Sequence, residues 1–161
     1  MDETRDWPAE QAAITASAAG REALIAASFA HVTGRQLVPV WADTAEAMFH
    51  QHAAIVAHGT EDDPVFFYGN RAALELFEMS AADFIRLPSR FSAEPVEREE
   101  RARLMERVAR EGFIDDYSGV RISSTGKRFL IERATVWNLR DESGGVHGQA
   151  AMFDHWTALG D

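Results

Sequence analysis

Six histidines are the residues best suited to metal, haem or proton chemistry: His31, His50, His52, His58, His147 and His155. His50 and His52 lie two residues apart in a segment that favours helix, so their side chains would point to different helical faces. No HExxH motif and no cluster of histidine with carboxylates at helical spacing accompanies them. We therefore expect no bound metal and assign no metal ligand.

Two pairs of adjacent carboxylates, Asp62-Asp63 and Asp115-Asp116, raise the question of acid–base chemistry. Side chains of neighbouring residues generally point apart, and exposed acids in turns explain both pairs. The serines show no histidine and acid companions, and the motifs GxSxG, GxGxxG and GxxxxGK are absent. We therefore expect a binding protein and not an enzyme, and we assign no catalytic residue.

The composition argues against several further kinds of function. Sixteen Lys and Arg residues against 26 Asp and Glu give a formal net charge of −10, which repels nucleic acid and anionic membrane surfaces. The absence of cysteine removes disulfides, thiolate zinc ligands and cysteinyl flavin adducts. The start MDETRDW is acidic, unlike a secretory signal, and no apolar run approaches about 18 residues. A cytoplasmic location without direct nucleic-acid or membrane contact is expected.

Hydrophobic spacing predicts the elements that must position any site. Residues 7–32 predict one or two helices with Gly34 as a stop, and residues 44–51 favour another helix. The short apolar runs at 53–59 and 64–69 predict two antiparallel strands joined by a polar connection. The first part of the chain therefore supplies a helical segment followed by a hairpin.

Further helices are expected after this hairpin. Asn70 can cap a helix that begins at Arg71, and Ser80 can cap a shorter helix after it. The stretch EPVEREERARLMERVAREG (94–112) is the clearest helix in the chain, with Gly112 as its stop. These helices separate the hairpin from the strands that follow.

Three antiparallel strands joined by hairpins are expected at residues 114–123, 128–139 and 146–153. In the middle strand, alternation predicts one face made of Phe129, Ile131, Thr135, Trp137 and Leu139. The other face also carries apolar residues, which indicates that both sides of the sheet are covered. The N-terminal helical segment or a second subunit could supply the extra layer.

This order of elements resembles the PAS fold, and the sequence motifs are close as well. YGNRAALELF is similar to the PAS strand-to-helix signature, and SSTGKRFLIERATVWNLRDESGGVHGQAAMF resembles its last two strands with their Asp-x-x-Gly turn. More narrowly, the chain resembles the MEKHLA domain, a PAS-related family of free-standing bacterial proteins and of some plant homeodomain transcription factors. The segments that carry this likeness are FFYGNRAALELFEMS, LPSRFSAEPVEREERARLM, DYSGVRISSTGKRF and ATVWNLRD. The resemblance covers residues 36–153.

The resemblance implies an α+β fold with a PAS-like five-stranded antiparallel sheet and short helices on one face. Residues 1–36 are expected to form an N-terminal helical extension, and residues 37–161 the PAS-like (MEKHLA) domain. PAS-like domains bind haem, flavins, organic acids or only protein, so the likeness identifies no cofactor. In haem-binding PAS domains the histidine ligand commonly lies on the long helix, and residues 94–111 contain none. Haem is therefore not expected.

A sheet that curls over short helices leaves a space beneath its concave face, which side chains fill or a ligand occupies. Aromatic residues provide rigid apolar walls, and an arginine beside them offers a fork of donors suited to a carboxylate. Arg90 or Arg121 is the expected polar anchor. The expected ligand-binding residues are Tyr68, Phe84, Arg90, Phe91, Tyr117, Arg121 and Trp137.

The leading hypothesis is a sensory or regulatory module that binds a small organic ligand in this space. Its output would run through a partner protein or a homodimer. The alternative is a ligand-free interaction or dimerisation domain whose core fills the space. A small enzyme that uses histidine or the paired acids is a third interpretation.

Overall fold

The computed structural model describes residues 5–93 and 95–160 of the 161-residue chain. Its helices are α1 (Trp7–Ala18), α2 (Glu22–Thr33), α3 (Thr44–Phe49), α4 (Arg71–Phe77), α5 (Ala81–Phe84), the 3-10 turn η1 (Ser89–Ser92) and α6 (Pro95–Glu111). Its strands are β1 (Ala54–His58), β2 (Phe66–Gly69), β3 (Phe113–Ile122), β4 (Arg128–Arg140), β5 (Val146–Phe153) and β6 (His155–Ala158). The helices and strands expected from spacing are confirmed. Within the described ranges, no helix has both the length and the apolar character needed to cross a bilayer.

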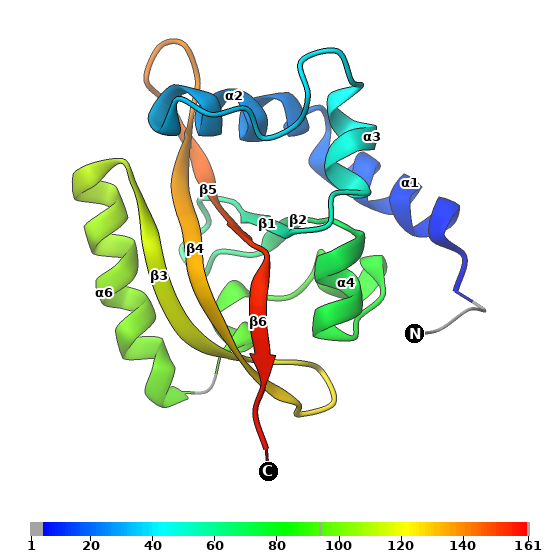
Figure 1. Cartoon of the computed structure of the whole chain (residues 1–161), viewed down its shortest axis with the longest axis vertical. Helices are drawn as coiled ribbons and strands as arrows, with labels where there is room; N and C mark the ends of the chain where they lie inside the picture. The colour runs from blue at the N-terminus through cyan, green and yellow to red at the C-terminus, as the bar shows by residue number, and fades with distance from the viewer. Residues whose placement is uncertain (1–4, 94, 161) are drawn as a thin grey trace.

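The strands form one antiparallel sheet in the order β2-β1-β5-β4-β3. The first strand of the chain, β1, is not at the edge of the sheet but lies between β2 and β5 (Figure 1). The short strand β6 pairs with the first residues of β4, at 129–132. Spacing did not predict β6, because its four residues are all exposed and carry no alternation. The α+β, PAS-like architecture that the resemblance implied is the one observed.

Helices cover both faces of this sheet (Figure 1). On one face, α6 packs on β3 and β4 through Leu104, Val108 and Val136. On the opposite face, α2 crosses β4, and the Trp137 Nε1–H donates a hydrogen bond to the Ile25 carbonyl (3.2 Å). The N-terminal helical segment therefore supplies the extra layer that the apolar outer face required.

Trp137 is the centre of the α2 interface. Its ring is fully buried and meets Phe29 edge to face at 4.9 Å between ring centroids. At the end of β4, the Ser28 hydroxyl accepts from the Arg140 N–H (3.0 Å) and donates to the Arg140 carbonyl (3.3 Å). Aromatic packing and backbone hydrogen bonds together fix α2 on the sheet.

Asn70 joins three elements at one buried point. Its Oδ1 accepts from the N–H of Ala73 (3.1 Å), which caps α4 as expected, and also from the N–H of Ile55 (2.9 Å). Its Nδ2 donates to the carbonyls of Met48 (3.0 Å) and Ala53 (2.9 Å). Because Asn70 is fully buried, this one side chain satisfies backbone groups of α3, of the start of β1 and of α4.

A bulge in β4 corrects the expected assignment of its faces. Ile131 pairs with Gly119 and Ala134 with Tyr117, so β4 uses one residue more than β3 over this stretch. Arg133 takes a positive φ of 52° there, a backbone conformation that residues other than glycine adopt only with strain. The extra residue moves Val136 to the face of Ile131 and sends Trp137 to the opposite face. The expectation that Ile131 and Trp137 share one face is therefore wrong.

Replacing Asn70 by alanine should destabilise the protein by more than a simple helix cap does. Several buried backbone groups would lose their partner, at about 1–3 kcal/mol for each one left unsatisfied, so we expect a loss of at least about 3 kcal/mol in urea unfolding. Ser80→Ala is the matched control, because the Ser80 hydroxyl accepts from the exposed Asp83 N–H (3.1 Å) and its loss should cost about 1 kcal/mol. Equal losses for the two variants would contradict the role given to Asn70.

Removing residues 1–36 should uncover the outer face of the sheet. Trp137 and its neighbours on that face would lose the α2 layer, and exposed apolar area drives association. We expect the truncated protein to self-associate or lose solubility in light scattering at concentrations where the full chain does neither. Unchanged oligomeric state and solubility after this deletion would show that the segment is an independent tail.

Candidate functional site

A small cavity lies between the concave face of the sheet and the helices α4 and α6. Its volume is about 50 Å³. Every sheet strand except β6 contributes to its described lining, together with α4, η1 and α6. The lining residues are Val56, Ala57, His58, Phe66, Phe77, Ser92, Leu104, Tyr117, Arg121, Ile131, Val136, Gln149, Ala150, Ala151 and Phe153.

Arg121 is the charged group of this cavity. Its side chain points to the cavity face of β3 and is 7% exposed. One guanidinium nitrogen donates to the Tyr117 hydroxyl (2.7 Å) and another to the Val120 carbonyl (2.9 Å). Both acceptors are uncharged oxygens, so these bonds orient the guanidinium without neutralising it.

Tyr117 holds Arg121 from the same face of β3. A Cβ atom on Gly119 would lie 2.2 Å from the Tyr117 hydroxyl oxygen, so glycine at this position leaves room for that hydroxyl. Tyr117, Gly119 and Arg121 pair with Ala134, Ile131 and Phe129 of β4. Alternation along β3 thus places the Tyr117 hydroxyl, the space left by Gly119 and the Arg121 guanidinium side by side at the cavity wall.

The other polar side chains of the lining also form hydrogen bonds. The buried His58 shares a hydrogen bond through Nδ1 with the Gly59 carbonyl (2.9 Å). The Gln149 amide donates to Asn138 Oδ1 (3.2 Å), and the Ser92 hydroxyl donates to the Ser89 carbonyl (2.7 Å). None of the described lining residues is acidic, so no carboxylate of the described lining offsets the charge of Arg121.

Phe77 closes the cavity from α4, and the next residue fixes its position. Glu78 ends α4 with a positive φ of 57°, and its carboxylate accepts from the hydroxyls of Ser123 (2.7 Å) and Thr125 (2.6 Å). Hydrogen bonds from Thr125 and Ser123 hold the pKa of the Glu78 carboxyl below its usual range. The β3–β4 turn is thereby tied to the helix that carries Phe77.

Two of the seven residues expected at the ligand site, Tyr117 and Arg121, line the cavity. Phe84 lies one layer behind it, because its ring stacks on the lining residue Phe66 at 4.5 Å between centroids. The fully buried Phe84 thus supports the wall without forming it.

Tyr68 and Trp137 lie on the other face of the sheet, outside this cavity. Tyr68 lies close enough to Glu22 of α2 for that carboxylate to act on its phenol, and the bulge in β4 turns Trp137 toward α2. Burial raises the pKa of the Tyr68 phenol, and the negative charge of Glu22 raises it further. Both aromatic residues therefore belong to the α2 side of the core.

Arg90 and Phe91 lie on the surface. The Arg90 Nε is 2.9 Å from Asp63 Oδ1 in an ion pair about half exposed on both sides. Phe91 is 43% exposed, and the Arg90 guanidinium lies over its ring at 4.1 Å. Of the two expected anchors, only Arg121 reaches the cavity.

Sequence reasoning missed the polar lining residues His58, Gln149 and Ser92. A signal existed for His58, because alternation along residues 53–59 places it on the same face as Val56. For Gln149 and Ser92 no such signal existed, because their position depends on how distant segments pack.

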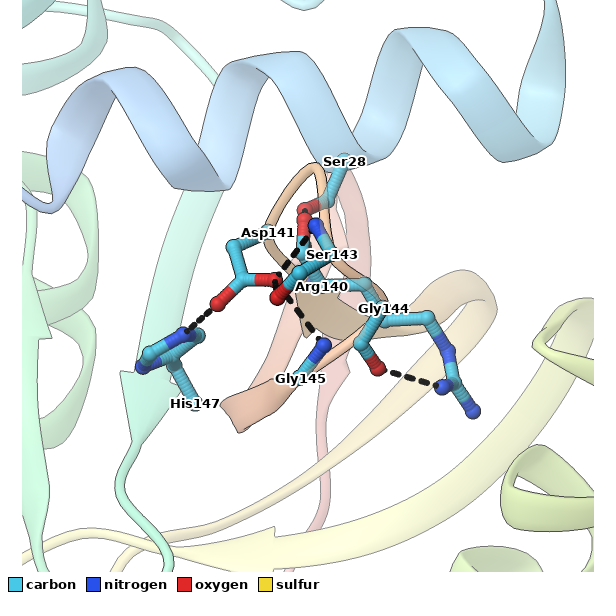
Figure 2. Close-up of polar contacts among 7 residues, drawn as sticks. All are labelled: Ser28, Arg140, Asp141, Ser143, Gly144, Gly145 and His147. Carbon is cyan, nitrogen blue, oxygen red and sulfur yellow. Dashed lines mark hydrogen bonds and ion pairs between the residues drawn. The ribbon is translucent and has the colours of Figure 1, made fainter.

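A second polar cluster lies at the β4–β5 turn, on the α2 side (Figure 2). Asp141 Oδ1 accepts from the Ser143 hydroxyl (2.6 Å) and from the N–H groups of Ser143 and Gly145 (both 2.9 Å). Asp141 Oδ2 lies 2.6 Å from His147 Nε2. Serine, histidine and aspartate meet here, but the serine hydroxyl bonds to the carboxylate and not to the imidazole, so no base activates it. The cluster shapes the Asp-x-x-Gly turn.

The paired acids singled out in the sequence lie on the surface, away from the cavity. Asp62, Asp63, Asp115 and Asp116 are all exposed, and Asp116 pairs with Arg107 (3.0 Å). No group of three or more histidine, aspartate or glutamate side chains that could hold a metal ion occurs within residues 5–93 and 95–160.

The sheet order, the helices on its concave face and the cavity between them define a PAS-like domain. A family model described as the MEKHLA domain matches residues 19–158. The chain therefore belongs to the MEKHLA domain family.

Known proteins resemble this chain in sequence or in fold. The homeobox-leucine zipper protein HOX29 of Oryza sativa subsp. indica is 25% identical over 115 residues, which are 71% of this chain and 13% of that protein. The PAS domain of a protein from Colwellia psychrerythraea superposes with a TM-score of 0.58 at 17% identity, over 71% of this chain and 92% of that one. The light-state dimer of the fungal blue-light photoreceptor Vivid gives 0.55 at 15% identity, over 83% and 90%. The two structures show a shared fold.

The β4–β5 turn should make stability depend on acidity. Hydrogen bonds from His147 and Ser143 hold the pKa of the Asp141 carboxyl far below its usual range. A carboxyl with a depressed pKa contributes stability that is present above its ordinary pKa of about 4 and lost as the pH falls through the folded value. Asp141→Asn should therefore lower the melting temperature at pH 7, and the difference from wild type should shrink in strong acid. The exposed neighbour Glu142, changed to Gln, is the control. A difference independent of pH would contradict this role.

Proposed function

We propose that this protein is a sensory or regulatory module that binds a small anion, such as a short carboxylate, in the cavity beside Arg121. The observation that carries the proposal is a buried guanidinium in an apolar cavity without a carboxylate among the described lining residues. The Arg121 guanidinium donates hydrogen bonds to the Tyr117 hydroxyl and to the Val120 carbonyl. A bound oxyanion would supply the missing charge.

The energetics of burial support an anionic ligand. Removing a charge from water is costly unless an opposite charge or a full set of hydrogen bonds replaces the solvent. A guanidinium has five N–H donors and binds carboxylates through two parallel hydrogen bonds. Arg121 is held in place by Tyr117, so little conformational entropy is lost when an anion binds.

The volume of the cavity limits the size of the ligand. About 50 Å³ is room for a few water molecules, against about 300–1,000 Å³ for usual small-molecule sites. The residues present therefore do not fit a flavin or a haem, and the chain has no cysteine for a flavin adduct. A short aliphatic carboxylate fits best, with its apolar part toward Phe77, Leu104 and Ile131.

The proposed output is a change in association with another protein, in the cytoplasm, without covalent catalysis. Vivid, a fold relative, is described as a light-state dimer, which supports association as an output for this architecture. A ligand bound beside Phe77 would shift the end of α4. The hydrogen bonds of Glu78 to Ser123 and Thr125 would transmit that shift to the β3–β4 turn.

The second candidate is a protein-interaction domain that binds no ligand, because its core side chains occupy most of the space beneath the sheet. The small volume of the cavity favours this candidate. Native mass spectrometry separates the two, since a bound anion adds its own mass to the folded protein and disappears on denaturation.

Replacing Arg121 by methionine should abolish the response to anions and leave the fold intact. Sodium acetate, propionate and butyrate would be compared with sodium chloride at equal ionic strength in thermal unfolding. We expect at least one carboxylate to raise the wild-type melting temperature and Arg121→Met to weaken its binding by about 2 kcal/mol or more, about 30-fold.

The unliganded variant provides a further check. Because methionine removes a buried charge that no carboxylate of the described lining offsets, unliganded Arg121→Met should be as stable as wild type or more stable. Arg90→Met is the matched control, because Arg90 is exposed and paired with Asp63. No carboxylate response in the wild type, together with a destabilised Arg121→Met, would favour the interaction domain.

A further inference from the structure

Two large apolar residues lie exposed at the tip of a tight turn. Val40 is 80% and Trp41 85% exposed. The Ala42 N–H donates to the Pro39 carbonyl (3.1 Å), so Val40 and Trp41 occupy the two corner positions, where Gly, Asn, Asp and Ser usually stand. Such exposure means that packing against the described residues does not explain a tryptophan there.

The turn is held firmly at both ends. Leu37 and Val38 are buried, and the Gln51 side chain donates to the Leu37 carbonyl (3.0 Å). On the other side, Asp43 caps α3 by accepting from the Glu46 N–H (2.9 Å). Trp41 is thus presented on an anchored support, which lowers the entropic cost of docking it.

An apolar groove lies beside this turn, where the α2–α3 connection runs back along α2 (Figure 1). Its volume is about 290 Å³. A cavity of about 150 Å³ holds a benzene ring, so the groove has room for an indole. None of its described lining residues is charged: Ala23, Ala26, Ala27, Ala30, Gln36, Leu37, Val38, Pro39, Val40 and Thr44.

We infer that this surface is a homodimer interface in which Trp41 of each copy enters the α2 groove of the other. A two-fold interface requires a self-complementary patch, with projection and recess on the same surface. Val40 lies at the groove while Trp41 projects from the same turn. With a net charge of −10, two copies repel each other, and an uncharged patch is where they can approach.

The expected interface is small. A buried aromatic side chain contributes about 150–250 Å², so two tryptophans in two grooves bury roughly 600–1,000 Å² counting both surfaces. Stable complexes usually bury about 1,200–2,000 Å². The dimer is therefore weak, and a regulatory signal could control it by modest changes in affinity.

Sedimentation equilibrium from about 1 µM to 1 mM tests this dimer. We expect wild type to change from monomer to dimer in this range, and Trp41→Ala and Ala23→Glu each to weaken dimerisation at least about 30-fold. Val146→Ala and Ala12→Glu are matched controls, because both positions are exposed and lie outside the groove. Added NaCl should strengthen wild-type dimerisation by screening the net charge.

Cross-linking provides an independent geometric test, because the chain has no cysteine of its own. Mixed Val40→Cys and Ala23→Cys proteins should form the mixed disulfide in preference to either homodimeric disulfide. A wild-type protein that stays monomeric up to 1 mM would overturn the proposal and leave the surface to a different partner. A dimer that Trp41→Ala and Ala23→Glu leave intact would equally overturn it, because another face would then form the contact.

Discussion

The buried amide of Asn70 is the constraint on which the rest of the structure depends. It bonds to backbone groups at the end of α3, before and within β1, and in the first turn of α4. β1 lies between β2 and β5, so this point sets the position of an inner strand. β1 carries Val56 and His58, and α4 carries Phe77, all three on the cavity lining. An amide has both donors and acceptors, and no other small side chain could satisfy this set.

Most of the architecture follows from local signals in the sequence. The caps at Asn70 and Ser80 and the helix stop at Gly34 are local features, and the structure uses each as expected. The faces of β4 could not be predicted, because alternation assumes an unbroken strand. A bulge at a non-glycine residue, Arg133, has no compositional signature, and it reverses every assignment after it.

The candidate site was predictable only where it depends on local alternation along a strand. Tyr117 and Arg121 lie four residues apart on one strand, so period-two alternation places them together. Arg90 could not be distinguished from Arg121 by type, and its position was decided by Asp63, 27 residues away in the sequence. The exposure of Trp41 was equally hidden, because an apolar residue between two helices normally predicts burial.

The Arg133 bulge also constrains how the sequence of this domain can change over evolution. Upstream of Arg133, β4 presents Phe129 and Ile131 to the cavity side, and downstream it presents Val136, with Trp137 opposite. Loss of that single residue would restore simple alternation along β4. The side chains after residue 133 would then point to the opposite faces of the sheet. We therefore expect insertions and deletions of one residue to be disfavoured in this stretch. Homologues should accordingly keep the residue count between Ile131 and Trp137.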